Sequence, residues 1–355
     1  MISLGLMRGV GATLLTFVIA CRMEPPPAGA DQGKAPSAQV PLGDPEPAAA
    51  TPTVDRSKTR IAPPVEIASI PTRFPAVPRV VAIGDVHGDL TATRRALRLA
   101  GAIDAEDRWI GDSLVVVQTG DQLDRGDDEQ AILDLFERLS REAAAAGGAF
   151  HALLGNHEMM NVAGDLRYVT PGGFADFEGI DGLALDDPSL SGARPYERAR
   201  RAAFMPGGPY ARILAQRNTV VIVGDSVFVH GGVLPEHVRG GLADLERLNA
   251  DVRRWLAGQL ALSEIADSVV SPDSVVWTRL YASDDPTTCA RLGQALSRLG
   301  AKRMIVGHTV QRSGITSGCE GRIWRIDVGM AAHYGGSVQV LQIEGDAVEP
   351  LALED

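Results

Sequence analysis

The stretch Arg79-Val80-Val81-Ala82-Ile83-Gly84-Asp85-Val86-His87-Gly88 shows the pattern that decides the fold, an apolar run followed at once by glycine and polar residues. The pattern returns at intervals of about 35 residues, in 114–126 and in 150–158. Each run is too short for a helix and too apolar for an exposed strand, so we expect strands of a covered sheet. Glycine allows sharp turns at the strand ends, the edge where open α/β sheets build their sites.

Residues with metal-binding side chains recur at these ends. The set comprises Asp85, His87, Asp121, Asn156, His230 and His308. The two histidines follow the apolar runs 226–229 and 304–306. Taken singly, each residue would more often be structural, but five glycine-flanked strand ends indicate one site. Carboxylate, imidazole and amide donors suit Mn, Fe or Zn better than Ca. We therefore predict a two-metal site that Asp121 can bridge.

The composition excludes some functions. The chain has 355 residues, with 34 Lys and Arg against 45 Asp and Glu, and a formal net charge of −11. This balance argues against a nucleic-acid surface but allows a local basic pocket for an anionic substrate. The sequence leaves the oligomeric state open.

The first residues are typical of a targeting signal. Arg8 precedes an apolar stretch, 10–20, that is too short to cross a bilayer of about 30 Å as a helix. Val18-Ile19-Ala20-Cys21 resembles the bacterial lipobox. We expect residues 1–20 to be a lipoprotein signal peptide and Cys21 to be lipidated. The alternatives are an uncleaved apolar anchor and a chance cysteine. The protein would then be extracytoplasmic, anchored to a bacterial membrane and facing the periplasm, with Arg22 slightly favouring the outer membrane.

Residues 21–75 are rich in Pro and Ala and poor in aromatic residues. We expect an extended, solvated tether there and a catalytic domain over 76–355. Two further cysteines, Cys289 and Cys319, would enter an oxidising compartment. They favour a disulfide that closes a loop of about 30 residues, the alternative being two buried thiols.

The order of the motifs GDVHG, GDQLDRG, GNHE, HGG and GHT resembles the calcineurin-like metallophosphoesterases, and their phosphoprotein phosphatase branch in particular. The resemblance covers about residues 78 to 345. Residues 160–168, M-N-x-x-G-D-x-R-Y, are similar to the Shewanella-like subgroup. The implied fold is an α/β (α+β) sandwich of two packed mixed sheets flanked by helices, with a dinuclear metal site at the strand ends.

The resemblance also assigns metal ligands. Asp85, His87 and Asp121 would bind one ion. The second ion would be bound by Asp121, Asn156, His230 and His308. We expect two divalent ions, Mn first, with Fe, Zn or Ni as alternatives. A hydroxide bridging them would attack phosphorus.

The remaining roles follow from the same resemblance. His157 would protonate the leaving oxygen, Asp124 would orient the His157 ring, and Arg125 would bind phosphate. Arg279, in Val276-Trp277-Thr278-Arg279, resembles the W-x-R arginine of bacterial and phage members, with a structural ion pair as its alternative. Tyr334 is compared with a tyrosine that eukaryotic members place over the metals, although Ala331-Ala332-His333 departs from their pattern.

Several segments are less decisive. Leu154 stands where eukaryotic members have an arginine. Asn161, Asp165 and Arg167 either shape the substrate cleft or serve packing and capping. Arg198, Arg200 and Arg201 are expected on a solvated helix face. We expect a strand over 323–329 and a hairpin over 337–351 that closes the second sheet.

We thus expect a metal-dependent phosphatase acting on phosphate monoesters, either phosphotyrosine or phosphoserine/threonine proteins. The first alternative is a hydrolase of nucleotides or dinucleoside polyphosphates, for which Tyr168, Phe174 and Phe177 do not identify a base-binding clamp. From another class, the alternative is a noncatalytic, metal-dependent binding protein of the cell envelope.

Overall fold

A computed structural model describes residues 69–353 of the chain. The signal peptide, the lipidation at Cys21 and most of the tether fall outside these residues. Within the described part, none of the helices has the length and apolar character needed to cross a bilayer.

The first of two sheets has five strands in the order β11-β10-β2-β3-β4. Its parallel strands are β2 (Val80–Ile83), β3 (Val115–Gln118) and β4 (Ala149–Ala152). The helices α1 (Leu90–Leu99) and α2 (Glu129–Ala145) connect them. All residues of β2 and β3 are buried, as expected for a parallel sheet covered on both faces. The three predicted strands are confirmed.

The second sheet has six strands in the order β1-β5-β6-β7-β9-β8. They are β1 (Arg73–Phe74), β5 (Val220–Val223), β6 (Ser226–Val229), β7 (Arg303–Val306), β8 (Thr316–Gly318) and β9 (Ile323–Arg325). The strands β6, β7 and β9 are parallel, so the loops after them leave the same edge of the sheet.

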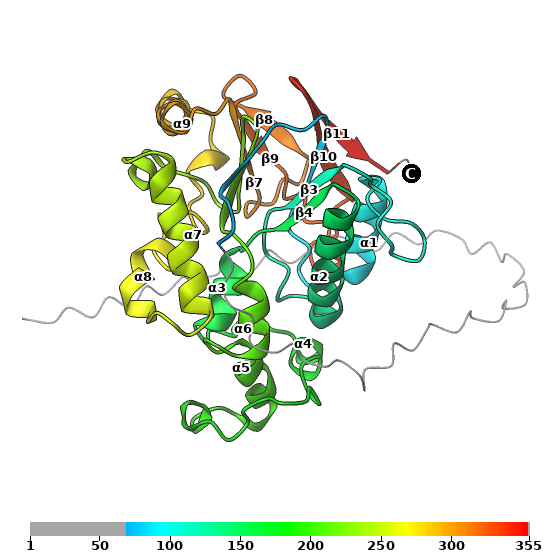
Figure 1. The fold of residues 1–355 in the computed structure, drawn as a ribbon, viewed down its shortest axis with the longest axis vertical. Helices are drawn as coiled ribbons and strands as arrows, with labels where there is room; N and C mark the ends of the chain where they lie inside the picture. Colours follow the sequence, from blue (N-terminus) through cyan, green and yellow to red (C-terminus); the bar gives the residue numbers. More distant parts are fainter. Residues whose placement is uncertain (1–68, 354–355) are drawn as a thin grey trace, which may run out of the picture. The chain divides into compact units, whose positions relative to one another are not determined.

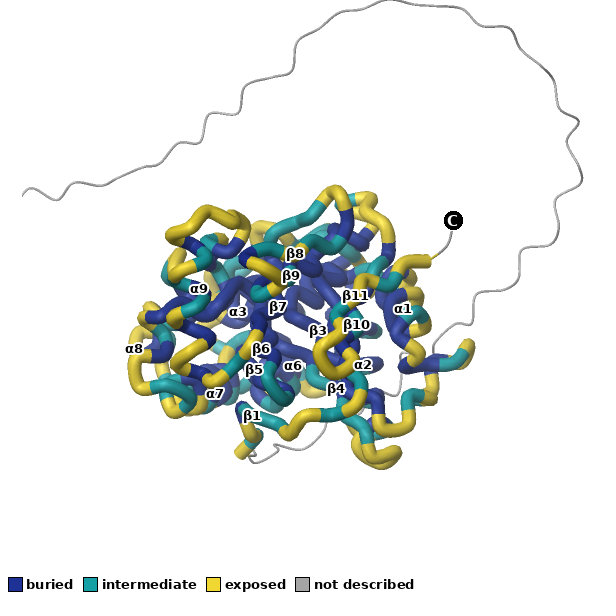
Figure 2. The backbone as a smooth tube through the Cα atoms, turned by 90° about the horizontal axis from the view of Figure 1, so that it is seen from above, coloured by how far each residue is buried: buried dark blue, intermediate teal, exposed yellow. Residues whose placement is uncertain are grey.

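The sheets pack face to face between two layers of helices (Figure 1). Val80 and Ala82 of β2 contact the other sheet, whereas Val81 and Ile83 face α1 and α2. This alternation is the two-residue period of a strand. The other sheet is covered by α7 (Leu242–Leu256) and α9 (Pro286–Leu299). Figure 2 shows the strands as the buried centre of this arrangement, so the predicted sandwich is confirmed.

The remaining helices are short. They are α3 (Asn156–Val162), α4 (Pro171–Ala175), α5 (Arg198–Phe204), α6 (Pro209–Leu214) and α8 (Leu262–Val269). Single 3-10 turns cover Pro188–Leu190, Pro195–Glu197, Pro235–Val238 and Leu280–Ala282. Figure 1 shows α3, α5 and α6 next to one another, where the chain between residues 159 and 218 packs.

Three sequence-based expectations need correction. The strand predicted over 323–329 ends at Arg325, because the following residues turn into the site. The predicted hairpin forms as β10 (Gln339–Glu344) and β11 (Ala347–Ala352), but β10 pairs with β2 and so extends the first sheet. The strand β1 pairs with β5 through residues before Ala76, so the folded unit begins earlier than the expected boundary.

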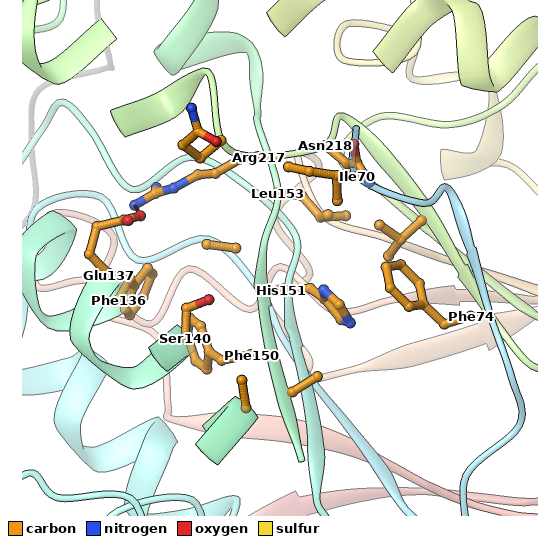
Figure 3. Close-up of a pocket in the computed structure, with 15 residues that line it drawn as sticks. Ile70, Phe74, Phe136, Glu137, Ser140, Phe150, His151, Leu153, Arg217 and Asn218 are labelled. Atoms are coloured by element: carbon orange, nitrogen blue, oxygen red, sulfur yellow. Dashed lines mark hydrogen bonds and ion pairs between the residues drawn. The ribbon is translucent and has the colours of Figure 1, made fainter. Parts of the chain in front are cut away.

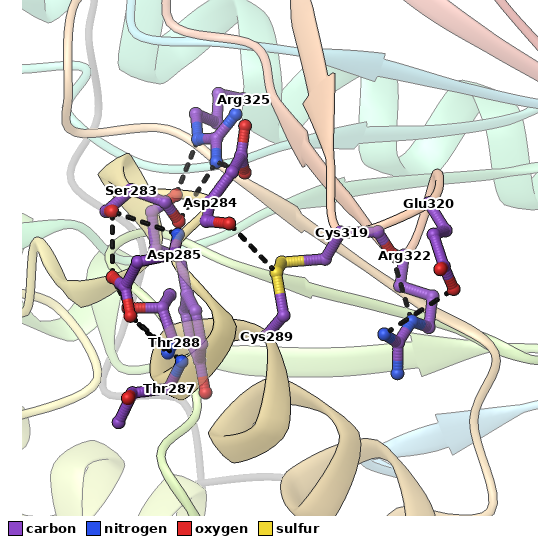
Figure 4. Close-up of a disulfide and its surroundings, with 11 residues drawn as sticks. Ser283, Asp284, Asp285, Thr287, Thr288, Cys289, Cys319, Glu320, Arg322 and Arg325 are labelled. Carbon is purple, nitrogen blue, oxygen red and sulfur yellow. Dashed lines mark hydrogen bonds and ion pairs between the residues drawn. A yellow bond between two sulfur atoms is a disulfide. The ribbon is translucent and has the colours of Figure 1, made fainter.

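The predicted disulfide is confirmed. Cys289 on α9 and Cys319 after β8 are bonded, with their Cα atoms 5.3 Å apart. The bridge therefore fastens a helix of the outer layer to the edge of the six-stranded sheet (Figure 4).

Reducing this bridge is expected to lower the free energy of unfolding by about 3 kcal/mol, because cross-linking a loop of this length restricts the unfolded chain. Urea unfolding with and without dithiothreitol measures the change. A Cys289→Ser, Cys319→Ser double variant is the control, and its unfolding midpoint should not respond to reductant. Equal midpoints for the oxidised and reduced wild type would contradict the expectation.

Candidate active site

The six predicted ligands converge in the structure. All are buried: Asp85, His87, Asp121, Asn156, His230 and His308. Ligand atoms of Asp121, His87 and His157 lie within 4.8 Å of one another. A second group, with the same spacing, joins Asp121 to His230 and His308. Asp121 is therefore the residue shared by two possible metal positions.

Asp85 and Asn156 complete this cluster. A carboxylate oxygen of Asp85 accepts a hydrogen bond from the backbone N–H of His308 at 3.1 Å. The amide oxygen of Asn156 lies 2.9 Å from Nε2 of His230. The two sheets thus contribute to one site, because β2, β3 and β4 supply one half of it and β6 and β7 the other.

Unusual backbone conformations aim these side chains inward. His87, Asp121 and His308 have positive φ values of 41°, 57° and 67°, which non-glycine residues rarely adopt. Such conformations concentrate at functional sites. At Gly155 a Cβ atom would lie 2.2 Å from a carboxylate oxygen of Asp121, so only glycine leaves that carboxylate in place.

Two acidic residues that the sequence reading did not assign support the cluster. The carboxylate of Glu158 accepts backbone N–H groups of Asp121 at 2.9 Å and of Gln122 at 2.8 Å. Asp327 follows β9 and is 1% exposed. Glu158 belongs to the GNHE motif and Asp327 follows a strand, so both carried a signal that sequence reasoning could have used.

The electrostatics of the cluster suit metal binding. Burial, and then the neighbouring Asp327 and Asp121, raise the pKa of Asp85 well above its usual range. Burial lowers the pKa of His87 to about 4 and that of His308 to about 3, which keeps both imidazoles neutral. Neutral imidazoles beside Asp85, whose carboxylate is costly to ionise, form a nitrogen and oxygen donor set that divalent cations would stabilise.

His157 lies next to this cluster and is held by Asp124. Its Nδ1 lies 2.5 Å from a carboxylate oxygen of Asp124. Its Nε2 lies 3.8 Å from a carboxylate oxygen of Asp121. Burial alone would lower the pKa of His157, but Asp121 and Asp124 raise it above its ordinary value. The ring therefore presents Nε2 to the cluster, as a proton donor requires.

The two predicted arginines lie near ligand histidines, Arg125 near His87 and Arg279 near His308. The guanidinium of Arg125 lies 4.6 Å from the ring centre of Tyr168 and 5.3 Å from that of Tyr334. The Tyr334 ring is in turn 5.4 Å from the ring of His87. Tyr334 thus stands beside the cluster, where the comparison with eukaryotic members expected a tyrosine.

Arg279 lies beside His308. It donates hydrogen bonds to the His308 carbonyl at 2.8 Å and to the Thr309 hydroxyl at 3.0 Å. Within residues 69–353 these are contacts with the chain around a predicted ligand and not with a carboxylate.

A groove of about 920 Å³ opens beside the cluster. Its walls are α1, residues 125–128, residues 170–172 and the loop 330–336, and both His87 and Arg125 line it. The groove is much larger than a phosphoryl group, so it can accept more of a substrate than the reacting phosphate.

The segment between residues 159 and 218 contains the largest departure from expectation. Arg200 was predicted on a solvated helix face, but it is 0% exposed and contacts Asp124, Glu129 and Asn161. Asp165 and Arg167 instead form an exposed ion pair. Phe177 is buried among Phe204 and Tyr210, so it supplies no clamp for a nucleotide base.

A second cavity, of about 290 Å³, lies apart from this chemistry (Figure 3). Phe74, Phe136 and Phe150 line it together with His151, and none of the six predicted ligands does. The His151 ring packs 4.4 Å from the ring of Phe74, and burial lowers its pKa to about 4. His151 is therefore a neutral packing residue.

The chain is similar in sequence and in fold to known phosphatases. Shewanella-like protein phosphatase 2 of Arabidopsis thaliana is 43% identical over 307 residues, which cover 78% of each chain. Shewanella-like protein phosphatase 1 of Plasmodium berghei is 29% identical over 267 residues, covering 72% of this chain and 69% of the relative. The solved cold-active protein-tyrosine phosphatase of a psychrophilic Shewanella species has a TM-score of 0.64 at 26% identity, covering 79% of this chain and 82% of that one.

The family description agrees with these relatives. The calcineurin-like phosphoesterase model matches residues 78–312, which contain all six buried ligands. The phosphatase relatives and the site together support hydrolysis of phosphoric monoesters. The chain therefore belongs to the calcineurin-like phosphoesterase family and is a phosphoric monoester hydrolase.

Proposed function

We propose that this protein is a dinuclear metal-dependent phosphoprotein phosphatase that favours phosphotyrosine over phosphoserine and phosphothreonine. The observation that carries the proposal is the pair of Asp124 and His157, whose Nε2 faces the shared ligand Asp121. A protein that only bound metal would have no need of a proton donor in this place.

The metal-binding residues divide between the two groups that share Asp121. One group contains His87 and the other His230 and His308. As the resemblance implies, Asp85 would join His87 at one ion, and Asn156, which contacts His230, would join the second group. When bound, two divalent ions, Mn first and otherwise Fe, Zn or Ni, would supply Lewis acidity and an activated water.

His157 serves as the general acid. When the bond between phosphorus and the leaving oxygen breaks, the electron pair stays on that oxygen and Nε2 delivers its proton to it. Asp124 accepts the hydrogen bond from Nδ1 and thereby stabilises the charged ring before the proton leaves.

The arginines bind the oxygens of the phosphoryl group. Arg125 and Arg279 lie near His87 and His308, and a guanidinium can donate two parallel hydrogen bonds to phosphate. Tyr168 and Tyr334 flank Arg125, whose guanidinium lies over one face of each ring. The rest of each ring is apolar surface against which the phenyl ring of phosphotyrosine can pack. The adjoining groove leaves room for the residues that flank it in a polypeptide.

Protein stripped of metal and resupplied with Mn is expected to release phosphate from a phosphotyrosine peptide faster than from the matching phosphoserine peptide. The reason is that a phenolate is a better leaving group and can pack against the two tyrosines. Initial rates on both peptides and on diadenosine tetraphosphate, with and without Mn, measure this preference.

Turnover confined to the dinucleotide would overturn the proposed substrate class and establish the first alternative. No metal-restored turnover on any of the three compounds would instead favour a metal-dependent binding protein.

A further inference from the structure

Arg200, on α5, lies at the centre of a buried polar network. Its fork binds both carboxylate oxygens of Glu129, at the start of α2, with Nη2 to Oε1 at 2.8 Å. Its Nε donates to the side-chain oxygen of Asn161 at 2.8 Å, and its Nη1 to the carbonyl of Gly173 at 2.8 Å. The guanidinium is thus completely enclosed.

The network ends on the residue that orients the proton donor. One oxygen of Asp124 faces His157, and the other accepts from Nη2 of Arg200 at 3.2 Å and from the amide of Asn161 at 3.0 Å. Asn161 also donates to the backbone carbonyl of His157 at 2.9 Å. The backbone N–H of Asp124 is bound by Glu129. Arg200 and two residues that it contacts, Asn161 and Glu129, therefore hold Asp124 in place.

We propose that Arg200 is a positioning residue for proton donation, acting through Asp124 on His157. This inference rests on the proposed role of His157. If Arg200 were buried only to join α5 to α2, its bidentate contact with Glu129 would be enough to balance its charge. The additional contact with Asp124 would then be unnecessary. Burying an arginine is costly unless its donors are used, and here Nη2 is shared between Glu129 and the Asp124 carboxylate while the other donors bind Glu129, Asn161 and Gly173.

The mechanism gives a readout that a purely structural role would not change. Phenolate from phenyl phosphate needs a proton, since the pKa of phenol is about 10, like that of tyrosine. Dinitrophenolate leaves readily as an anion. Damage to proton donation therefore slows phenyl phosphate more than 2,4-dinitrophenyl phosphate. A loss of folded protein slows both equally, so the ratio of the two kcat/KM values does not depend on the folded fraction.

The experiment measures this ratio for the Mn-loaded wild type and for Arg200→Met, Arg200→Lys and Asn161→Ala. Arg200→Met is expected to lower the ratio of phenyl to dinitrophenyl phosphate about tenfold, a part of the 10²- to 10⁴-fold effect of general acid catalysis. Arg200→Lys keeps the charge without the planar fork, so it should fall between Arg200→Met and the wild type. Asn161→Ala removes the other donor to the same oxygen and should lower the ratio as well.

Arg201→Met is the matched control, since the neighbouring arginine is half-buried, pairs with Glu197 and does not contact Asp124. Its ratio should equal that of the wild type. Asp124→Asn shows whether the assay reports on proton donation, because it alters the contact with His157 directly.

Suppose that Asp124→Asn lowers the ratio, which shows that the assay reports on proton donation. A wild-type ratio in Arg200→Lys and Asn161→Ala would then overturn the role of Arg200. Arg200→Met, if it is soluble, should in that case also show the wild-type ratio. If Asp124→Asn also leaves the ratio unchanged, the proposed proton donor itself is wrong and the inference falls with it. A lowered ratio in both Arg200→Lys and Asn161→Ala would support the inference without Arg200→Met.

Discussion

The His157→Asn variant is expected to hydrolyse phenyl phosphate about 10²- to 10⁴-fold more slowly than the wild type, with KM almost unchanged. An asparagine cannot deliver a proton to the leaving oxygen, whereas the groups that bind phosphate remain. An interaction made only in the transition state lowers kcat without altering ground-state binding. Initial rates over a range of substrate concentrations, with the Mn-loaded variant, measure both parameters.

The control for this experiment is His151→Asn, because the His151 imidazole packs against Phe74 outside the site, where burial lowers its pKa. It should keep wild-type kcat. Bound metal is measured in both variants, so that a loss of ions can be told apart from a loss of the proton donor. A His157→Asn protein with full activity would show that another group protonates the leaving oxygen.

The Asp121→Ala variant is expected to lose metal from both positions, because Asp121 is the residue that the two ligand groups share. Its carboxylate also accepts the backbone N–H of His157 at 3.0 Å, so its removal loosens the start of α3 as well. Changes to groups that only support a ligand cost about 10- to 100-fold in metal affinity or activity. Removal of the shared ligand should cost more than that. Mass spectrometry of bound metal and titration calorimetry with Mn measure the loss.

Asp251→Asn is the matched control, since Asp251 is a surface carboxylate on α7 that pairs only weakly, with Arg254 at 3.3 Å. It should bind as much Mn as the wild type. Retention of two ions per chain by Asp121→Ala would mean that Asp121 is not the shared ligand. Retention of one ion would restrict its role to a single position.

The central sheet and the ligand set were predictable because their signals are local. A short β-branched run such as 80–83 can bury both faces only in a covered strand, and the adjacent Gly84 marks where the chain turns. Since the ends of parallel strands meet at one edge, the spacing of Asp85, Asp121 and Asn156 along the chain was enough to bring them together. The disulfide between Cys289 and Cys319 was predictable because the sequence led us to expect export, and these two cysteines remained once Cys21 was set aside.

Other features depended on partners far apart in the sequence. The hairpin 339–352 has a clear turn at Gly345, but the turn does not say which sheet edge receives β10. Asp327 became part of the site only because β9 lies parallel to β7 and ends at the same edge. Alternation and turn residues define an element, whereas its neighbours are decided by packing of the whole chain.

The sequence by itself thus determined the covered strands and the buried cluster of Asp, Asn and His side chains at their ends, with His157 beside it. Only the tertiary structure decided the place of Arg200, which is 71 residues from Glu129 and 76 from Asp124. An arginine on a short helix is normally solvated, because burying its charge is costly. That cost is offset only when distant carboxylates surround the guanidinium, and no local pattern in the sequence records such an arrangement.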